Sequence, residues 1–392
     1  MNRPFTLHVI VVPLVFLAVM QLGGCTRDTS VAPAPAGGVY RSASAGAAFE
    51  QSVQVTDKPG EYIAAFSLHQ IFRAPDNPEV VYIAADSRGI VVSHDDGQTW
   101  EVIVTPLTRT FDVVALANKV LVASGVDGAG QGFVIRSLDG GKSWQSVLTV
   151  PLPKKEERGI EIIKPAPLPA SVVLSIEPDP FNADRIYAGS SLGTLLAGEQ
   201  SAKVWKNIQT ITTGKLTGGQ PGTEAVAKLI PSPHRQGEVL VITNSKQLLR
   251  IRDGQIEVIK IPSKLNEPAS FVLGVGTPKQ VLDAGYVAGF PDALLVGVED
   301  GAVITRDGGL TWLQLPVPVE AAQVFNSAVV TISPTNANRL LVAINNVFYR
   351  SEDGGTTWNT FSLGLPNHII TGLSINPQNA AKVLAVTNLF QN

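Results

Sequence analysis

The chain has 392 residues, of which 30 are Lys or Arg and 33 are Asp or Glu, so its formal net charge is −3. Charged residues make up only 16% of the chain and form no long basic run, which excludes an extended nucleic-acid interface. The single cysteine, Cys25, excludes an intrachain disulfide, so the fold must be stable through burial alone.

The first 25 residues are predicted to be a signal segment. Arg3 supplies a basic start, and residues 9–20 are apolar but too short for a good membrane span. The segment ends in Leu22-Gly23-Gly24-Cys25, which resembles the bacterial lipobox and implies a diacylglycerol on Cys25. An ordinary secretory signal with an incidental cysteine is the alternative. Because two acyl chains anchor stably, we expect a protein held on a membrane outside the cytoplasm, with Thr26 favouring the outer membrane under the enteric sorting rule.

Residues 26–48 are small, polar and rich in Pro and Gly, which predicts a flexible tether. Residues 49–392 remain as one domain, a length that suits a single repeat array.

A turn pattern of Pro-x-Asn recurs along this domain, at Pro75, Pro180, Pro334 and Pro377. Pro fixes φ, and the Asn side chain can bond the backbone two residues on. Runs that alternate apolar and polar residues lie on both sides of each turn, which indicates strands. Each repeat unit is therefore predicted as strand A, this turn, strand B, a short loop, strand C, a second turn and strand D.

The second turn carries the strongest signal, Ser/Thr-x-Asp-x-Gly-x-Thr/Ser-Trp, which we call the Asp-box. Its Asp can accept backbone N–H groups, and its Gly supplies a left-handed backbone angle. Burial of the Trp contributes about 4–6 kcal/mol as an upper bound, against about 1 kcal/mol for each hydrogen bond, so a box without its Asp can survive. The four copies are Ser93, Asp95, Gly97 and Trp100; Ser137, Asp139, Gly141 and Trp144; Thr305, Asp307, Gly309 and Trp312; and Ser351, Asp353, Gly355 and Trp358.

Degenerate copies at 195–205 and 249–255 complete the repeat. The blades are expected at 62–104, 111–149, 171–209, 224–261, 268–316 and 327–364, with a half unit at 369–392. An open half blade is a pairing hazard, so we expect the alternating residues 48–55 to join it. The predicted fold is all-β: a seven-bladed β-propeller of four-stranded antiparallel blades, closed by an N-terminal strand that joins the C-terminal half blade.

These boxes resemble the Asp-box, or bacterial neuraminidase, repeat of sialidases, sortilin-type receptors, xyloglucanases and the photosystem II stability/assembly factor family. A lipoprotein built only of such repeats is most similar to the assembly-factor group. That resemblance implies a non-enzymatic assembly scaffold with a membrane or envelope protein complex as its client, in the thylakoid lumen if the host is photosynthetic. The fold itself says little about function.

A sialidase-like enzyme, or a glycan-binding propeller, is the alternative. The stretch Phe72-Arg73-Ala74-Pro75 resembles the sialidase Phe/Tyr-Arg-Ile-Pro motif, and that family implies an arginine triad, a Tyr–Glu pair and an Asp acid. Pro75, however, begins a repeat turn, so we expect Arg73 at the end of a strand A. The Asp-box carboxylates recur once per blade without converging, which indicates a structural role. The histidines lack metal-ligand spacing, so neither a metal nor another cofactor is expected.

The face opposite the boxes is the predicted binding surface, because the D–A and B–C connections meet there. Long D–A connections are expected at 151–169 and 210–223, and an insertion at 277–292 is expected between strands A and B of blade five, on the box side. We expect a monomer that grips a protein client with this face and reaches the membrane through Cys25. The basic residues assigned to the binding face are Arg88, Arg109, Lys154, Lys155 and Arg158.

Overall fold

The computed structural model describes residues 35–56, 58–150, 171–217, 220–263, 265, 278–319 and 327–390. The predicted signal peptide with Cys25, and the basic residues Lys154, Lys155 and Arg158, lie outside the described residues. Within these ranges, no helix is both long enough and apolar enough to cross a membrane.

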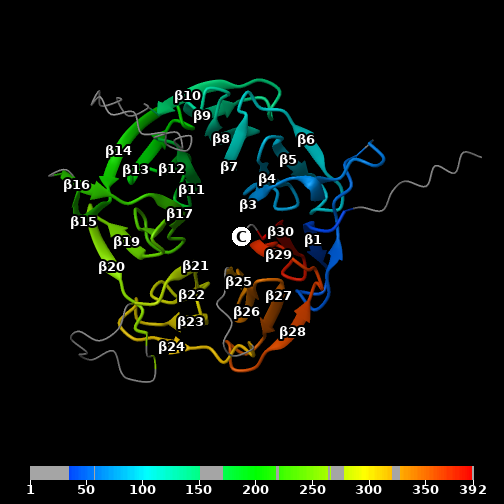
Figure 1. Ribbon diagram of the computed structural model, residues 1–392, viewed down its shortest axis with the longest axis vertical. Coiled ribbons are helices and arrows are strands. Elements are labelled where there is room, and N and C mark those ends of the chain that lie inside the picture. Colours follow the sequence, from blue (N-terminus) through cyan, green and yellow to red (C-terminus); the bar gives the residue numbers. More distant parts are fainter. Residues whose placement is uncertain are drawn as a thin grey trace, which may run out of the picture. The chain divides into compact units, whose positions relative to one another are not determined.

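Seven four-stranded antiparallel sheets surround a central axis as the blades of a propeller, which confirms the predicted fold (Figure 1). Blades one to three are β3 (Leu68–Arg73), β4 (Val81–Ala85), β5 (Gly89–Ser93) and β6 (Glu101–Ile103); β7 (Arg109–Leu116), β8 (Val120–Val126), β9 (Gly132–Ser137) and β10 (Gln145–Val150); and β11 (Val173–Asp179), β12 (Asn182–Ser190), β13 (Thr194–Glu199) and β14 (Val204–Thr210). Blades four to six are β17 (Val226–Pro231), β18 (Val239–Thr243), β19 (Leu248–Arg252) and β20 (Gln255–Ile259); β21 (Val281–Tyr286), β22 (Leu294–Val298), β23 (Gly301–Thr305) and β24 (Leu313–Gln314); and β25 (Ala328–Ser333), β26 (Asn336–Ile344), β27 (Val347–Ser351) and β28 (Asn359–Ser362). Blade seven is β29 (His368–Ile375), β30 (Val383–Leu389), β1 (Gly38–Ser42) and β2 (Glu50–Gln51).

The second and third strands of the blades form the core because each blade packs face to face on its neighbours. In β5, β8, β18, β22 and β23 every residue is buried. Such strands are nearly continuous apolar runs of Val, Ile, Leu and Ala. The outermost strands, such as β14 and β20, are mostly exposed.

Blade seven joins the two ends of the chain, but by a different strand from the one predicted. The strand that pairs with β30 is β1, with Gly38 opposite Thr387 and Ser42 opposite Val383. The predicted closing segment, 48–55, is wrong in this role: Glu50 and Gln51 form β2, which pairs only with β1.

Strand β1 lies within the segment predicted to be a tether. Its small residues make it resemble a linker in the sequence. The fold requires at least one of them, because a Cβ on Gly38, whose φ is +86°, would lie 2.7 Å from the side chain of Val53. Val39 and Tyr40 nevertheless supply the apolar side chains of a strand and are buried. The propeller therefore begins at least ten residues before the predicted domain boundary of residue 49.

The β1–β2 turn is a fifth box that the sequence pattern missed, with serine in place of aspartate. We call Ser42, Ser44, Gly46 and Phe49 the serine box. Ser42 Oγ accepts the N–H of Gly46 at 2.9 Å, as Ser93 Oγ accepts that of Gly97 at 2.7 Å in blade one. Ser44 Oγ accepts the N–H of Ala48 at 3.1 Å, and Phe49 stacks on Phe348 at 4.1 Å between ring centroids, in the place of the box tryptophan.

The substitution Ser44→Asp is expected to stabilise the propeller by about 1 kcal/mol, because a carboxylate accepts charge-assisted bonds where the hydroxyl accepts one neutral bond. Urea unfolding measures the change. Ala43→Asp adds the same charge at the neighbouring exposed position and is the control, expected to leave the unfolding midpoint unchanged. A midpoint that Ser44→Asp fails to raise above this control contradicts the assignment of the serine box.

Blade five lacks the insertion predicted between its first two strands. Its innermost strand is β21 (Val281–Tyr286), which lies inside the range 277–292 assigned to that insertion. The β21–β22 connection is the short stretch from Val287 to Ala293, whose ends are joined by a 2.9 Å backbone bond. The prediction was wrong because the apolar run at 269–275 resembles the first strand of a blade. The extra residues precede β21 and belong to the D–A connection at 260–280. In blade three, the D–A connection at 210–223 contains a hairpin of β15 (Thr212–Thr217) and β16 (Gln220–Thr223).

Candidate functional site

The Asp-box turns are closed hydrogen-bonded units on one face of the propeller, which we call the box face. In blade six, Asp353 accepts the N–H groups of Thr356 and Thr357 at 3.0 and 2.9 Å and both flanking hydroxyls, Thr357 at 2.6 Å and Ser351 at 2.8 Å. The bonds from Thr357, together with that from Ser351, lower the pKa of Asp353 to about 2. The same pattern surrounds Asp95 and Asp139. These carboxylates hold their own turns and do not converge on a shared centre.

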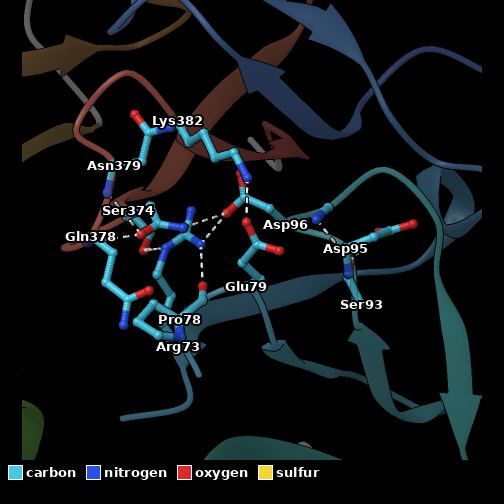
Figure 2. Close-up of polar contacts among 12 residues, drawn as sticks. Arg73, Pro78, Glu79, Ser93, Asp95, Asp96, Ser374, Gln378, Asn379 and Lys382 are labelled. Atoms are coloured by element: carbon cyan, nitrogen blue, oxygen red, sulfur yellow. Dashed lines mark hydrogen bonds and ion pairs between the residues drawn. The ribbon is translucent and has the colours of Figure 1, made fainter. Parts of the chain in front are cut away.

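Arg73 also lies on the box face, at the end of β3, and not in the centre of the ring as a sialidase-type clamp requires. Figure 2 shows its guanidinium between blades one and seven, where it pairs with Asp96 and donates to Pro78 O at 2.7 Å. Its Nε donates to Ser374 Oγ of β29 at 2.9 Å. The side chains of Arg73 and Asp96 are only 6% and 2% exposed, so they form a buried ion pair within blade one, and the bond to Ser374 joins this pair to blade seven.

A cavity of about 610 Å³ occupies the centre of the ring, between the innermost strands of all seven blades. Its lining reaches Ser67, just before β3, and Leu389 and Phe390, at the end of β30, on the face where the B–C and D–A connections lie, which we call the mouth face. The cavity is lined at two levels by one residue from each blade: His69, Phe111, Leu174, Ala227, Leu282, Val329 and Thr371 near the mouth, and Gln70, Asp112, Ser175, Lys228, Asp283, Val330 and Gly372 below them. None of the described residues that line it is an arginine, so these residues supply no arginine triad of the kind that the sialidase resemblance implies.

Several polar residues of the channel join neighbouring blades. Asp112 Oδ2 accepts the N–H of Ile176 in the next blade at 2.9 Å, and Asp283 Oδ2 accepts that of Val330 at 3.0 Å. Ser175 Oγ accepts the N–H of Leu229 at 3.1 Å in the same way. Both aspartates are buried, so their first role is to fix the spacing of the innermost strands.

One carboxyl group next to the channel lining has a raised pKa. Glu177, two residues beyond Ser175 on β11, accepts a bond from Gln70, and its burial raises its pKa to about 7. Burial, together with the nearby Glu177, raises the pKa of Asp112 as well. Lys228 donates to Asp283 at 2.7 Å and is the cation of the group. Among the described residues, no cluster of three or more His, Cys, Asp or Glu side chains could hold a metal ion.

The rim of the channel carries two arginine–aromatic pairs on blade one and the adjoining strand of blade two. Arg109 stacks on Phe111 at 5.3 Å and makes a two-pronged ion pair with Asp86, with Nε–Oδ1 and Nη2–Oδ2 distances of 2.9 Å. Arg88 stacks on Phe66 at 5.2 Å. Among the described residues no carboxylate pairs with Arg88, so its exposed guanidinium has free donors.

The structure thus places Arg88 and Arg109 on one face, as the loop geometry indicates, but gives them different roles. Asp86 neutralises the charge of Arg109. Of these two arginines, Arg88 is therefore the one whose charge is available to a ligand. The sequence did not indicate Phe66 as a partner because it is distant from Arg88 along the chain, whereas Phe111 lies only two positions after Arg109 on β7 and could have been found from the alternation of the strand. The ring of residues that lines the channel was not predicted, although a charged residue inside an apolar strand, such as Asp112, is a signal for it.

The fold and its turns define the class of this protein: a seven-bladed β-propeller with Asp-box connections and a polar channel. No protein-family model matches the chain, and no curated protein does.

Solved structures do match it. YCF48 bound to D1 peptide superposes with a TM-score of 0.53 at 16% identity, over 86% of this chain and 99% of that one. YCF48 from Cyanidioschyzon merolae gives a TM-score of 0.52 at 14% identity, over 82% and 95%. The extracellular domain of the putative hybrid two-component system BT4673 from B. thetaiotaomicron gives 0.54 at 13% identity, over 87% and 39%. At these identities the similarity is one of fold.

Proposed function

We propose that this chain is a non-enzymatic binding propeller that holds a protein client on its mouth face. The observation that carries the proposal is the rim, where the guanidinium of Arg88, which pairs with no carboxylate in the described ranges, lies on Phe66, the residue before the channel-lining Ser67. A lipid on Cys25 would hold the protein in the bacterial envelope, on the periplasmic side of the outer membrane, or in the thylakoid lumen of a photosynthetic host. The client would be a membrane or envelope protein complex.

The chemistry of the rim fits an extended protein segment. An arginine stacked on an aromatic ring is preorganised to bind a carboxylate through two parallel bonds, and aromatic and arginine residues are enriched among the side chains that dominate protein interfaces. Below the rim, Leu174, Leu282 and Val329 form an apolar wall that can receive an aliphatic side chain. The structurally similar YCF48 was solved with a D1 peptide, which supports a protein segment as the class of ligand.

A glycan-processing propeller is the second candidate, favoured by the raised pKa of Glu177, which bonds the channel-lining Gln70. Against it, both oxygens of the neighbouring Asp112 accept backbone N–H groups at 2.8 and 2.9 Å and are not free for acid–base work. Assays with sialosides and β-glucans separate the two functions. Hydrolysis that is lost in Glu177→Gln would establish the enzyme and overturn the proposed scaffold.

Arg88→Glu is expected to weaken client binding at least tenfold, because it replaces the free guanidinium with a charge that repels a client carboxylate. The client is first identified by crosslinking in membranes, and its affinity for purified variants is then measured in detergent. Lys142→Glu makes the same charge change on the exposed box face and is the matched control, expected to leave affinity unchanged. Equal affinities for the two variants contradict the proposed binding face.

A further inference from the structure

The N-terminal segment enters the propeller beside the proposed binding face. Strand β1 begins at Gly38, opposite Thr387, and the next residues of that C-terminal strand, Asn388 and Leu389, line the mouth of the channel. Strand β1 then runs to Ser42, where the serine box lies among the turns of the box face. The chain therefore reaches the mouth face first and the box face second.

The residues before β1 are held at the same end. Gln51 of β2 donates through Nε2 to Gly37 O at 2.8 Å and to Pro35 O at 2.7 Å. These bonds fix the chain at Pro35 to β2, the outermost strand of blade seven. Only the residues between Cys25 and Pro35 remain to connect this point to a lipid.

The length of that connection limits how the propeller can face a membrane. Ten residues span at most about 36 Å when fully extended. The coil predicted from their composition spans about 17 Å on average. The five residues of β1 alone rise about 17 Å toward the box face. Placing the box turns on the bilayer would therefore require the connection to span at least the rise of β1, which equals its whole average reach, whereas the mouth face lies at the end where the connection begins.

We propose that this short connection turns the mouth face toward the bilayer. The partner of that face is then a segment of a membrane protein that emerges from the same bilayer within the reach of the connection, and not a protein free in the surrounding compartment. The inference rests on the lipid anchor and the binding face of the proposed function. It adds an orientation and a location for the client.

The test measures orientation without any client. Ser87→Cys and Gln98→Cys place a fluorophore on the mouth and box faces of blade one, and Ser245→Cys and Gln255→Cys do so on blade four, which lies across the ring from blade seven (Figure 1). The lipidated variants are bound to phosphatidylethanolamine–phosphatidylglycerol vesicles that contain a headgroup nitroxide. We expect at least twofold stronger quenching on the mouth face in both pairs. Inserting 20 Gly/Ser residues before Pro35 is expected to remove this difference.

Equal quenching within each pair, or stronger quenching on the box face, overturns the inference. Stronger quenching of both blade-one labels than of both blade-four labels would mean that the ring stands on its edge, which also overturns it. Cys25→Ser is the control for the anchor and is expected to abolish quenching at all four positions. Client affinity in detergent is measured separately with Arg88→Glu. A negative quenching result therefore does not contradict the proposed binding face, and an unchanged client affinity does not contradict the proposed orientation.

Discussion

Arg73→Ala is expected to destabilise the propeller by about 3–5 kcal/mol, since removing one partner of a buried ion pair leaves the other charge without compensation. Asp96 would keep a 3.2 Å bond from Asn376 but lose its cation while buried. The variant also deletes the bond from Arg73 Nε to Ser374, which joins blade one to blade seven. Urea unfolding followed by tryptophan fluorescence measures the loss.

A second ion pair at the same junction is the matched control. Lys382 Nζ lies 2.5 Å from Glu79, but Glu79 is half-exposed, so Lys382→Ala is expected to cost less than about 1 kcal/mol. The double variant Arg73→Met with Asp96→Leu removes both buried charges together and is expected to recover most of the stability. An Arg73→Ala variant no less stable than Lys382→Ala would contradict the structural role given to Arg73.

Trp100→Ala is expected to cost about 3–5 kcal/mol, the range for deleting a large aromatic side chain from a core. Trp100 is fully buried, and its Nε1 donates to Ser52 O at 2.9 Å. Its own carbonyl accepts the N–H of Thr56 at 2.7 Å. The substitution therefore loosens the chain between blade seven and blade one, which limited proteolysis detects as a new cleavage near residues 52–56.

Two further variants test why this residue matters. Trp144 is partly exposed and its Nε1 has no partner within the described residues, so Trp144→Ala is expected to cost about half as much. Asp95→Ala removes the acceptor of the box turn and is expected to cost about 1–2 kcal/mol. If Asp95→Ala lowers the free energy of unfolding more than Trp100→Ala does, the hydrogen bonds of the box stabilise the turn more than the packing of its tryptophan, contrary to this prediction.

The repeated part of the fold could be predicted because each blade carries its own local signals. A Pro-x-Asn turn, alternating apolar residues and a box with Trp mark one blade within about 40 residues. The closing strand could not be predicted in this way. The bond from Thr387 to Gly38 spans 349 positions, and no local pattern indicates such a pairing. In addition, the serines and glycines of the serine box resemble a linker when read without their partners.

The candidate site was predictable only as a face. The order of strands places the B–C and D–A connections together, so Arg88 and Arg109 were expected on one side. Which of the two arginines can bind a ligand depends on Asp86, because Asp86 pairs with Arg109. This pairing follows from the packing of blade one on blade two, which the sequence does not show. Arg73 shows the same limit: the turn pattern places it at the end of a strand, but its partner Asp96 belongs to a different turn.

The shared seventh blade also has a kinetic consequence. During synthesis or export, β1 and β2 are made first, and β30, the strand that pairs with β1, is the last strand of the described chain. For the whole of that interval β1 is an edge strand with no inner neighbour, and Val39 and Tyr40 lack the surface that buries them. Pairing between such distant segments is slow to form, so ring closure is expected to be the last folding step. A chaperone that shields this strand would act before the final blade assembles.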